Sequence, residues 1–286
     1  MAQQITIAND KVRAVISTIG AELKSLTKDN KEILWEGNPD VWAGQAPVLF
    51  PMCGGLKDDK YVFEGKEYTM LKHGFGRMSE FEVEYSDDTS AVFLLCANDE
   101  TKKQYPFDFE FRIRYTLCDN TLKVDYDVTN TGDGVMYYSV GAHEGYACPE
   151  GIEEYSIVFE CEEDLKSNIL IGNLLDYNQL DVMSATKELP LKNEYFAVDA
   201  LVFTNIKSRK VWLKNNKCGK VVEVAFDNHD YLLLWTMPGG FKYICIEPWT
   251  GLPDFVDSEY DFTAKKGITK LDASQNKVYS HSITLM

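Results

Sequence analysis

The strongest constraint on the fold is a strict two-residue alternation between residues 107 and 117. Polar or charged residues separate the apolar ones, which are Phe107, Phe109, Phe111, Ile113, Tyr115 and Leu117. Successive side chains of an extended chain point to opposite faces, so this pattern predicts a strand with one buried and one solvated face. Residues 122–129 repeat the alternation after a polar break, which predicts an antiparallel hairpin.

Strand-like patterns continue along the whole chain, and the predicted fold class is therefore all-β. They cover residues 5–17, 61–70, 135–143, 154–161, 210–226, 241–247 and 277–286, with Asn and Gly in the turns between them. In residues 135–143 both the odd- and the even-numbered positions are mostly apolar, as in a strand that is covered on both faces. Short helices are expected only around residues 38–44 and 174–181. Because no Gly/Ser linker or shift in composition divides the chain, we predict one domain over residues 1–286, a large antiparallel β-sandwich with a few short helices.

The charge of the chain narrows the classes of partner. Its formal net charge is −16 over 286 residues, whereas nucleic acids and anionic membranes are bound by an excess of Lys and Arg. The N-terminal residues do not form a cationic segment followed by a long apolar one, and the longest apolar runs fall far short of the ~20 residues of a membrane helix. We therefore expect a cytoplasmic protein that binds an uncharged small molecule, and neither nucleic acid nor a membrane. A homodimer is compatible with the chain.

The seven cysteines are scattered, odd in number and without a CxxC pair, which is typical of reduced thiols in a cytoplasmic protein. The sequence contains no HxH or HExxH, no GxSxG elbow, no Walker loop and no GxGxxG after a strand. These observations predict neither a metal site nor a nucleotide cofactor.

Two of the four histidines have the setting of functional residues. His143 ends the apolar strand predicted before it, where a rigid backbone can hold a side chain that points out of the sheet. His73 lies in the segment HGFGR, four residues before Arg77. A hydrogen-bonded, space-filling histidine is the alternative at position 143. Structural or solvent-facing roles are expected for the other two histidines. His229 lies in a polar turn, and His281 lies on the same face of the last strand as its alternating apolar residues.

Glu247 ends another apolar strand. Burying a carboxyl group without a partner raises its pKa toward values that suit a general base. Pairing with Lys242 would instead make Glu247 structural. In the loop that follows, Trp249 offers a ring that could stack on a sugar and Asp254 a carboxylate that could accept sugar hydroxyls; ordinary loop packing explains both equally.

Three short segments in chain order, HGFGR, SVGAH and CIEPWTG, resemble the galactose mutarotase (aldose 1-epimerase) family, in particular its LacX-like branch. Similar segments also occur at STIGAELKSL, at residues 32–56, at DVTNTGD and at residues 232–249, so the resemblance extends over nearly the whole chain. It implies a β-supersandwich and a cofactor-independent isomerase that opens the pyranose ring of an aldose and lets it close on either face.

The resemblance also implies roles for individual residues. Glu247 matches the family's general base, which removes the anomeric hydroxyl proton, and His143 matches the general acid that protonates the ring oxygen. His73 matches the second histidine, which helps to hold the ring oxygen. Arg77 matches an arginine, and Asp199 an aspartate, that bind sugar hydroxyls. One acid and one base are sufficient for such an exchange of protons, without a metal, nucleotide or covalent intermediate.

The chain departs from its apparent relatives at two places. His143 is followed by Glu144 where many relatives have proline, and an acidic side chain that faced the site would raise the histidine pKa. Residues 42–45 lack the arginine that sugar-phosphate-specific relatives carry ahead of their FP pair. The expected substrate is therefore a neutral hexose such as galactose or glucose.

Two other functions fit the sequence. A non-catalytic carbohydrate-binding or regulatory protein would keep the sugar pocket without turnover. A glycoside hydrolase or lyase would pair Glu247 with Asp254 or Glu144, since glycosidases use two carboxyl groups. The leading prediction is an aldose 1-epimerase of carbohydrate metabolism.

Overall fold

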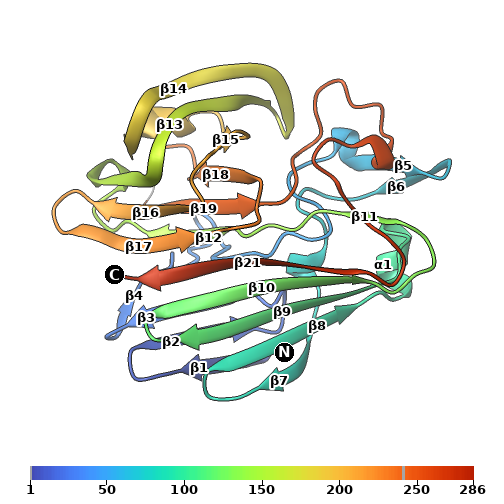
Figure 1. Ribbon diagram of the computed structural model, residues 1–286, viewed down its shortest axis with the longest axis horizontal. Helices are drawn as coiled ribbons and strands as arrows, with labels where there is room; N and C mark the ends of the chain where they lie inside the picture. The colour runs from blue at the N-terminus through green and yellow to red at the C-terminus, as the bar shows by residue number, and fades with distance from the viewer. Residues whose placement is uncertain (1, 240–241) are drawn as a thin grey trace.

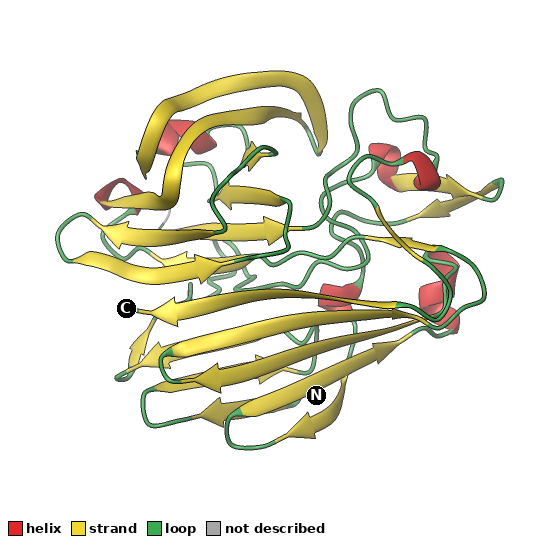
Figure 2. Ribbon diagram, viewed as in Figure 1, coloured by secondary structure: helices red, strands yellow, loops and turns green. Residues whose placement is uncertain are grey.

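Two β-sheets of unequal size form most of the protein, for which the computed structural model describes residues 2–239 and 242–286. Within each sheet, all paired strands run antiparallel, and among these residues parallel pairing occurs only at isolated single bridges. Figures 1 and 2 show the larger sheet folded into stacked layers, with the long curved hairpin of β13 and β14 arching over one end. Gly240 and Phe241 lie outside the described residues, and Phe241 is the first residue of the predicted strand 241–247.

The larger sheet has 13 strands. In spatial order they are β12 (Glu144–Ala147), β19 (Tyr243–Trp249), β18 (Tyr231–Trp235), β15 (Leu201–Phe203), β13 (Tyr155–Ile171), β16 (Lys210–Asn215), β17 (Gly219–Ala225), β21 (Asn276–Leu285), β10 (Thr121–Asn130), β9 (Phe109–Cys118), β8 (Ser90–Cys96) and β7 (Glu82–Ser86), with β14 (Leu174–Pro190) paired to β13. The smaller sheet contains β1 (Gln4–Ala8), β2 (Val12–Ser17), β3 (Leu23–Lys28) and β4 (Lys31–Glu32).

Two further strand pairs and a few helical turns complete the described part of the chain. The pairs are β5 (Lys60–Phe63) with β6 (Lys66–Thr69), and β11 (Met136–Tyr138) with β20 (Thr269–Leu271). The helix is α1 (Asp99–Gln104), and the 3-10 turns are Lys57–Asp59, Gly76–Met78, Ile152–Glu154, Asn193–Phe196 and Phe262–Ala264. In these residues no helix is long and apolar enough to cross a membrane.

The predicted hairpin is confirmed as β9 and β10, with Tyr115 opposite Val124 and Phe111 opposite Val128. All the alternating apolar residues of β9 are buried, while Arg114 between them is exposed. The buried face packs on the smaller sheet, where the Tyr115 hydroxyl donates a hydrogen bond to the carbonyl oxygen of Ala21 at 2.8 Å. One continuous apolar core therefore joins the two sheets.

The two expected helices are absent from the described structure. Residues 174–181 belong to the long strand β14, because they pair with β13 in the curved hairpin. Residues 38–42 form a turn, in which the amides of Val41 and Trp42 both donate to the Asn38 carbonyl. The helix that does form, α1, begins with a capping box between Asn98 and Thr101. Sequence reasoning did not identify α1.

The segment 135–143 is mostly buried, but it is a strand only over β11. Beyond β11 it forms single bridges from Gly141 to Leu49 and to Trp249, so no continuous ladder develops. His143 consequently lies immediately before β12 and not at the end of a long strand. Glu247 also differs from expectation, since it lies inside β19 and not at the strand end.

Candidate active site

All six residues singled out in the sequence line one cavity of about 390 Å³. They are Glu247, His143, His73, Arg77, Asp199 and Trp249. The other lining residues used below are Trp42, Gly54, Lys72 and Trp235. The six predicted residues come from four separate parts of the chain, and only the folded structure brings them together. Their chemical roles stay predictions.

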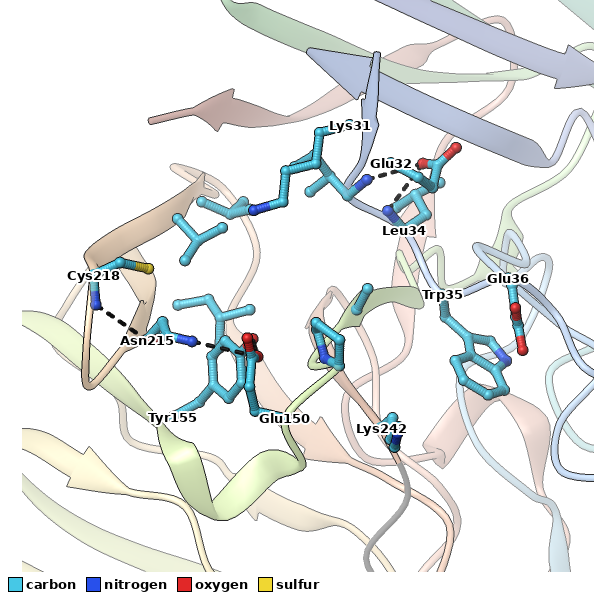
Figure 3. A pocket seen from close by; sticks show the side chains of 16 residues that line it. Lys31, Glu32, Leu34, Trp35, Glu36, Glu150, Tyr155, Asn215, Cys218 and Lys242 are labelled. Carbon is cyan, nitrogen blue, oxygen red and sulfur yellow. Dashed lines mark hydrogen bonds between the residues drawn. The ribbon is translucent and has the colours of Figure 1, made fainter. Parts of the chain in front are cut away.

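A second cavity, of about 490 Å³, is larger but has a different character (Figure 3). It contains no histidine, and its Glu150 carboxylate is engaged by the Tyr155 hydroxyl and by Asn215 Nδ2. Lys242 lines this cavity, so it does not pair with Glu247. Because proton transfer needs titratable groups that are free to reach a ligand, the smaller cavity is the candidate active site.

The two central groups of the site are His143 and Glu247, whose Nε2 and Oε2 atoms are 3.4 Å apart. Glu247 is 1% exposed and His143 8% exposed. The strand β12, which begins after His143, pairs with β19, so adjacent strands present the two side chains to each other. At this separation the contact is longer than an ordinary hydrogen bond. Among the described residues, Glu247 Oε2 and His143 Nδ1 have no hydrogen-bond partner.

Burial shifts both groups toward their uncharged forms. Desolvation lowers the pKa of His143 to about 3. Desolvation also raises the pKa of Glu247 well above its usual range, with Asp199 and Glu144 adding to the effect and Lys72 opposing it. Perturbed pKa values of this kind are common where a side chain accepts and returns protons.

His73 is held in an unusual backbone conformation at the edge of the cavity. Its φ of 71° lies in the left-handed region that a side-chain-bearing residue rarely adopts. Two bonds to one glycine hold it, since the His73 amide donates to the Gly54 carbonyl at 2.8 Å and the Gly54 amide donates to His73 Nδ1 at 3.2 Å. Accepting at Nδ1 assigns the proton of the neutral ring to Nε2, and burial lowers the pKa of His73 well below its usual value. His73 is therefore a neutral hydrogen-bond donor.

Gly74 explains why this loop is glycine-rich. Its φ is 68°, and a Cβ there would lie 2.3 Å from the Phe50 carbonyl oxygen. No other residue fits so close an approach of two backbones. The HGFGR segment is thus shaped to bring His73 and Arg77 to the same cavity wall.

Aromatic rings form a second wall. The Trp42 ring centroid lies 5.2 Å from that of His143, and Trp235 meets the same imidazole edge-on at 5.7 Å. Sequence reasoning did not identify Trp42 or Trp235, although both are large rings next to predicted segments. Trp249 is only 3% exposed and donates its Nε1 hydrogen to the Ala142 carbonyl. Trp249 therefore packs largely into the wall and offers little free ring for stacking.

Three charged residues surround the remaining part of the cavity. Arg77 donates to the Lys72 carbonyl at 3.1 Å, and its Nε has no partner in the described structure. Lys72 Nζ lies 4.0 Å from Asp199 Oδ2. Lys72 was missed from the sequence, although its place directly before His73 was the available signal. Together these groups offer both donors and an acceptor to a polyhydroxylated ligand.

Two carboxylates considered from the sequence lie elsewhere. Asp254 is buried in an ion pair with Lys265, at 3.0 Å, and is not part of the cavity. Glu144 points to the opposite face of its strand from His143 and bonds to His281. The pairs of carboxyl groups proposed for a glycoside hydrolase, Glu247 with Asp254 or with Glu144, are therefore not assembled in this cavity.

One group of potential metal-binding side chains occurs in the described residues, consisting of His143, Cys245 and Glu247, with ligand atoms within 4.8 Å of one another. Burial raises the pKa of the Cys245 thiol well above its usual value. Metal ligation requires the thiolate, and a carboxyl group with a raised pKa is also a poor ligand. The donor set does not fit a metal centre.

In this β-sandwich one cavity combines a carboxyl group, two histidines and three charged side chains. The aldose 1-epimerase family model matches residues 3–270, and the chain belongs to this family. It is 32% identical to the plasmid-encoded protein LacX of Lactococcus lactis subsp. lactis over 99% of both chains.

Solved structures agree with this assignment. A galactose mutarotase related enzyme from Lactobacillus acidophilus is 33% identical and superposes with a TM-score of 0.93, covering 99% of this chain and 97% of the other. A galactose mutarotase-like protein from Lactobacillus casei is 30% identical with a TM-score of 0.94, over 99% and 100% of the two chains. The expected β-supersandwich of the galactose mutarotase type is therefore confirmed.

Proposed function

We propose that this protein is an aldose 1-epimerase that interconverts the α and β anomers of a neutral hexose by general acid and base catalysis. The observation that carries the proposal is the 3.4 Å contact between His143 Nε2 and Glu247 Oε2 in a cavity that Arg77, Lys72 and Asp199 also line. The hydroxyl oxygen O1 and the ring oxygen O5 of an aldose are bonded to the same carbon. An acid and a base that serve both atoms must therefore lie close together, as these two do.

In the proposed reaction Glu247 takes the proton from O1 while His143 gives a proton to O5. The C1–O5 bond breaks, its electron pair goes to O5, and O1 becomes the carbonyl oxygen of the open aldehyde. Rotation about the C1–C2 bond exposes the other face of the aldehyde. The same two groups then return their protons in reverse as the ring closes. Each proton transfer of this kind typically contributes about 10²–10⁴-fold to the rate.

The proton balance of the pair is consistent with this cycle. The charged form, with Glu247 ionised and His143 protonated, holds the same number of protons as the uncharged form that burial favours in the free protein. Moving one proton across the contact converts one form into the other, so the pair titrates as a unit. The pH dependence of catalysis will therefore report apparent pKa values of the pair and not of either residue.

Substrate binding is assigned to His73 and to the charged wall of the cavity, which consists of Arg77, Lys72 and Asp199. The Nε2 hydrogen of His73 is a donor to the ring oxygen, while Arg77 and Lys72 are donors and Asp199 is an acceptor to the hydroxyls. Asp199 offsets the charge of Lys72, with which it is in contact at 4.0 Å. With this offset and a chain charge of −16, a neutral hexose fits better than a phosphorylated one.

Polarimetry on freshly dissolved α-glucose and α-galactose tests the proposal. The expected result is a faster change of optical rotation with the protein than without it, and loss of that acceleration in Glu247→Gln. If neither these sugars nor other common aldoses respond, the protein is not an aldose 1-epimerase.

A carbohydrate-binding protein without turnover is the second candidate, supported by one observation. Burial favours the uncharged form of the His143 and Glu247 pair, and this form can hold a sugar without exchanging protons. Saturable binding of galactose in calorimetry together with an unchanged rate of mutarotation would favour this candidate.

A further inference from the structure

A second histidine–carboxylate pair lies in the core, on the side of β12 away from the cavity. His281 Nε2 and Glu144 Oε1 are 2.9 Å apart, and both side chains are almost completely buried. Glu144 is the first residue of β12, at one end of the large sheet, whereas His281 lies in β21, with six strands between them in the sheet order. The bond therefore connects two distant parts of the folded sheet.

Aromatic hydroxyls surround Glu144, and in the described residues its salt-bridge and hydrogen-bond partner is the His281 ring. The Glu144 charge adds to burial in raising the pKa of Tyr115, Tyr126 and Tyr146, so these three hydroxyls stay protonated around it. The Tyr126 ring is 5.4 Å from the His281 ring. Within the described chain, His281 is the hydrogen-bond partner of Glu144, and Glu144 Oε2 has none. Losing the imidazole would leave a carboxylate alone in the core.

Glu144 is also connected to both central groups of the candidate active site. It directly follows His143, and adjacent residues of an extended chain point to opposite faces. In the pairing of β12 with β19, Glu144 lies opposite Ile246, which is the residue before Glu247. Fixing Glu144 in the core therefore fixes the backbone from which His143 and Glu247 enter the cavity on the other face.

We propose that the Glu144–His281 pair positions the proposed acid and base: by tying the start of β12 to β21, it holds the His143 imidazole against Glu247. The negative charge of Glu144 has a second effect, because it contributes to the raised pKa of Glu247. The proposal rests on the proposed function for its kinetic part only. Glu144 and His281 are positioning residues, since neither borders the cavity.

Two replacements of Glu144 separate position from charge. Glu144→Gln keeps the shape and an oxygen that accepts from His281 Nε2, but removes the charge. Glu144→Leu removes the bond as well. In Glu144→Leu we expect kcat to fall about 10- to 100-fold with KM within twofold of the wild type, because small displacements of reacting groups have effects of this size. In Glu144→Gln we expect a smaller loss of kcat and an acid limb of the kcat/KM profile that moves to lower pH.

The direction of that shift follows from the titratable and charged groups around Glu247. His143, Lys72, Asp199 and Cys245 lie near it, and Glu144 acts on it from the other face of the sheet. Glu144 is one of the two negative charges that raise the pKa of Glu247, so its removal lowers that pKa, and the lower apparent pKa of the His143–Glu247 pair moves down with it. An unchanged acid limb in Glu144→Gln, together with wild-type kcat in Glu144→Leu, would overturn the proposal.

Glu163→Gln is the matched control, because Glu163 is an equally buried carboxylate that accepts from the Ser208 amide and hydroxyl, both at 2.7 Å, away from the cavity. It should lower the melting temperature without changing kcat or the pH profile. If Glu144→Leu does not fold, Glu144→Gln and His281→Gln carry the test, since His281→Gln keeps a donor for Glu144 and should retain kcat.

A readout without catalysis keeps this proposal separate from the proposed function. Nitrogen-15 NMR of the histidine rings should show altered His143 resonances in Glu144→Leu and unaltered ones in Glu163→Gln. A wild-type protein that does not accelerate mutarotation would refute the proposed function alone. Unaltered His143 resonances in Glu144→Leu would refute the positioning role, whatever the activity.

Discussion

The protein contains two histidine–carboxylate pairs that differ in geometry. In the core, His281 and Glu144 are in hydrogen-bond contact at 2.9 Å, whereas in the cavity His143 and Glu247 face each other at 3.4 Å. The core pair is sealed by sheet strands and tyrosines, and the cavity pair borders open space. The same two residue types thus serve stability when they are fully in contact. Under the proposed function, the cavity pair is the one that transfers protons, because its contact is loose and a ligand can reach both groups.

Glu247→Gln gives the largest expected effect and tests the cavity half of this comparison. We expect a loss of kcat of about 10²–10⁴-fold, because the amide cannot accept the O1 proton. The free energy of unfolding should not fall, since a buried carboxyl group without a good hydrogen bond is removed. Polarimetry and urea unfolding on the same preparation give both quantities. A large loss of stability would mean that the pair is structural.

A double-mutant cycle tests the core half. Glu144→Leu alone should lower the free energy of unfolding by about 1–3 kcal/mol, because the His281 ring is left without its hydrogen-bond partner in the core. The double replacement Glu144→Leu with His281→Leu should recover most of that loss. The same cycle on Glu247 and His143 should show a much weaker coupling energy. Equal coupling energies in the two cycles would remove the distinction between the pairs.

The acid sensitivity of stability should come from histidines that are buried uncharged. Burial lowers the pKa of His143 to about 3 and those of His73 and His229 well below 6.5. Below pH 6.5 the unfolded chain binds these protons and the folded protein does not, so stability is lost as the pH falls toward the folded pKa values.

His229→Phe isolates one of these contributions outside the cavity. Each such histidine contributes about 1.4 kcal/mol per pH unit in that window, and the variant should show a correspondingly shallower decline of stability between pH 6 and pH 5 in urea unfolding. Comparing variant with wild type is necessary because the raised pKa of Glu247 acts in the opposite direction. An identical pH slope in the two proteins would contradict the assignment.

Lys72→Met gives the smallest expected effect and tests the charged wall of the cavity. Loss of one donor to a sugar hydroxyl should raise KM about three- to tenfold with little change in kcat. Initial rates of mutarotation over a range of galactose concentrations measure both constants. Lys242→Met, in the other cavity, is the control and should behave as the wild type. A fall in kcat alone would assign Lys72 to the chemistry and not to binding.

Much of the fold followed from local pattern. The alternation in β9 and β10 fixed their register and buried face, because a period of two leaves only one way to cover the apolar side. The pattern failed where tertiary pairing decided the structure. Residues 174–181 became strand by pairing with β13, and residues after Tyr138 left the ladder to make single bridges to two other segments.

The sequence by itself determined the all-β fold, the family resemblance and six of the residues that line the cavity, but not Trp42, Trp235 or Lys72. Only the tertiary structure decided which carboxylate faces which histidine: Glu247 meets His143, while Glu144 turns to the core and meets His281, and Asp254 meets Lys265. The reason is physical. Alternation along one strand tells which residues share a face, but the partner of each face is set by strands distant in sequence that the folded sheet brings into contact.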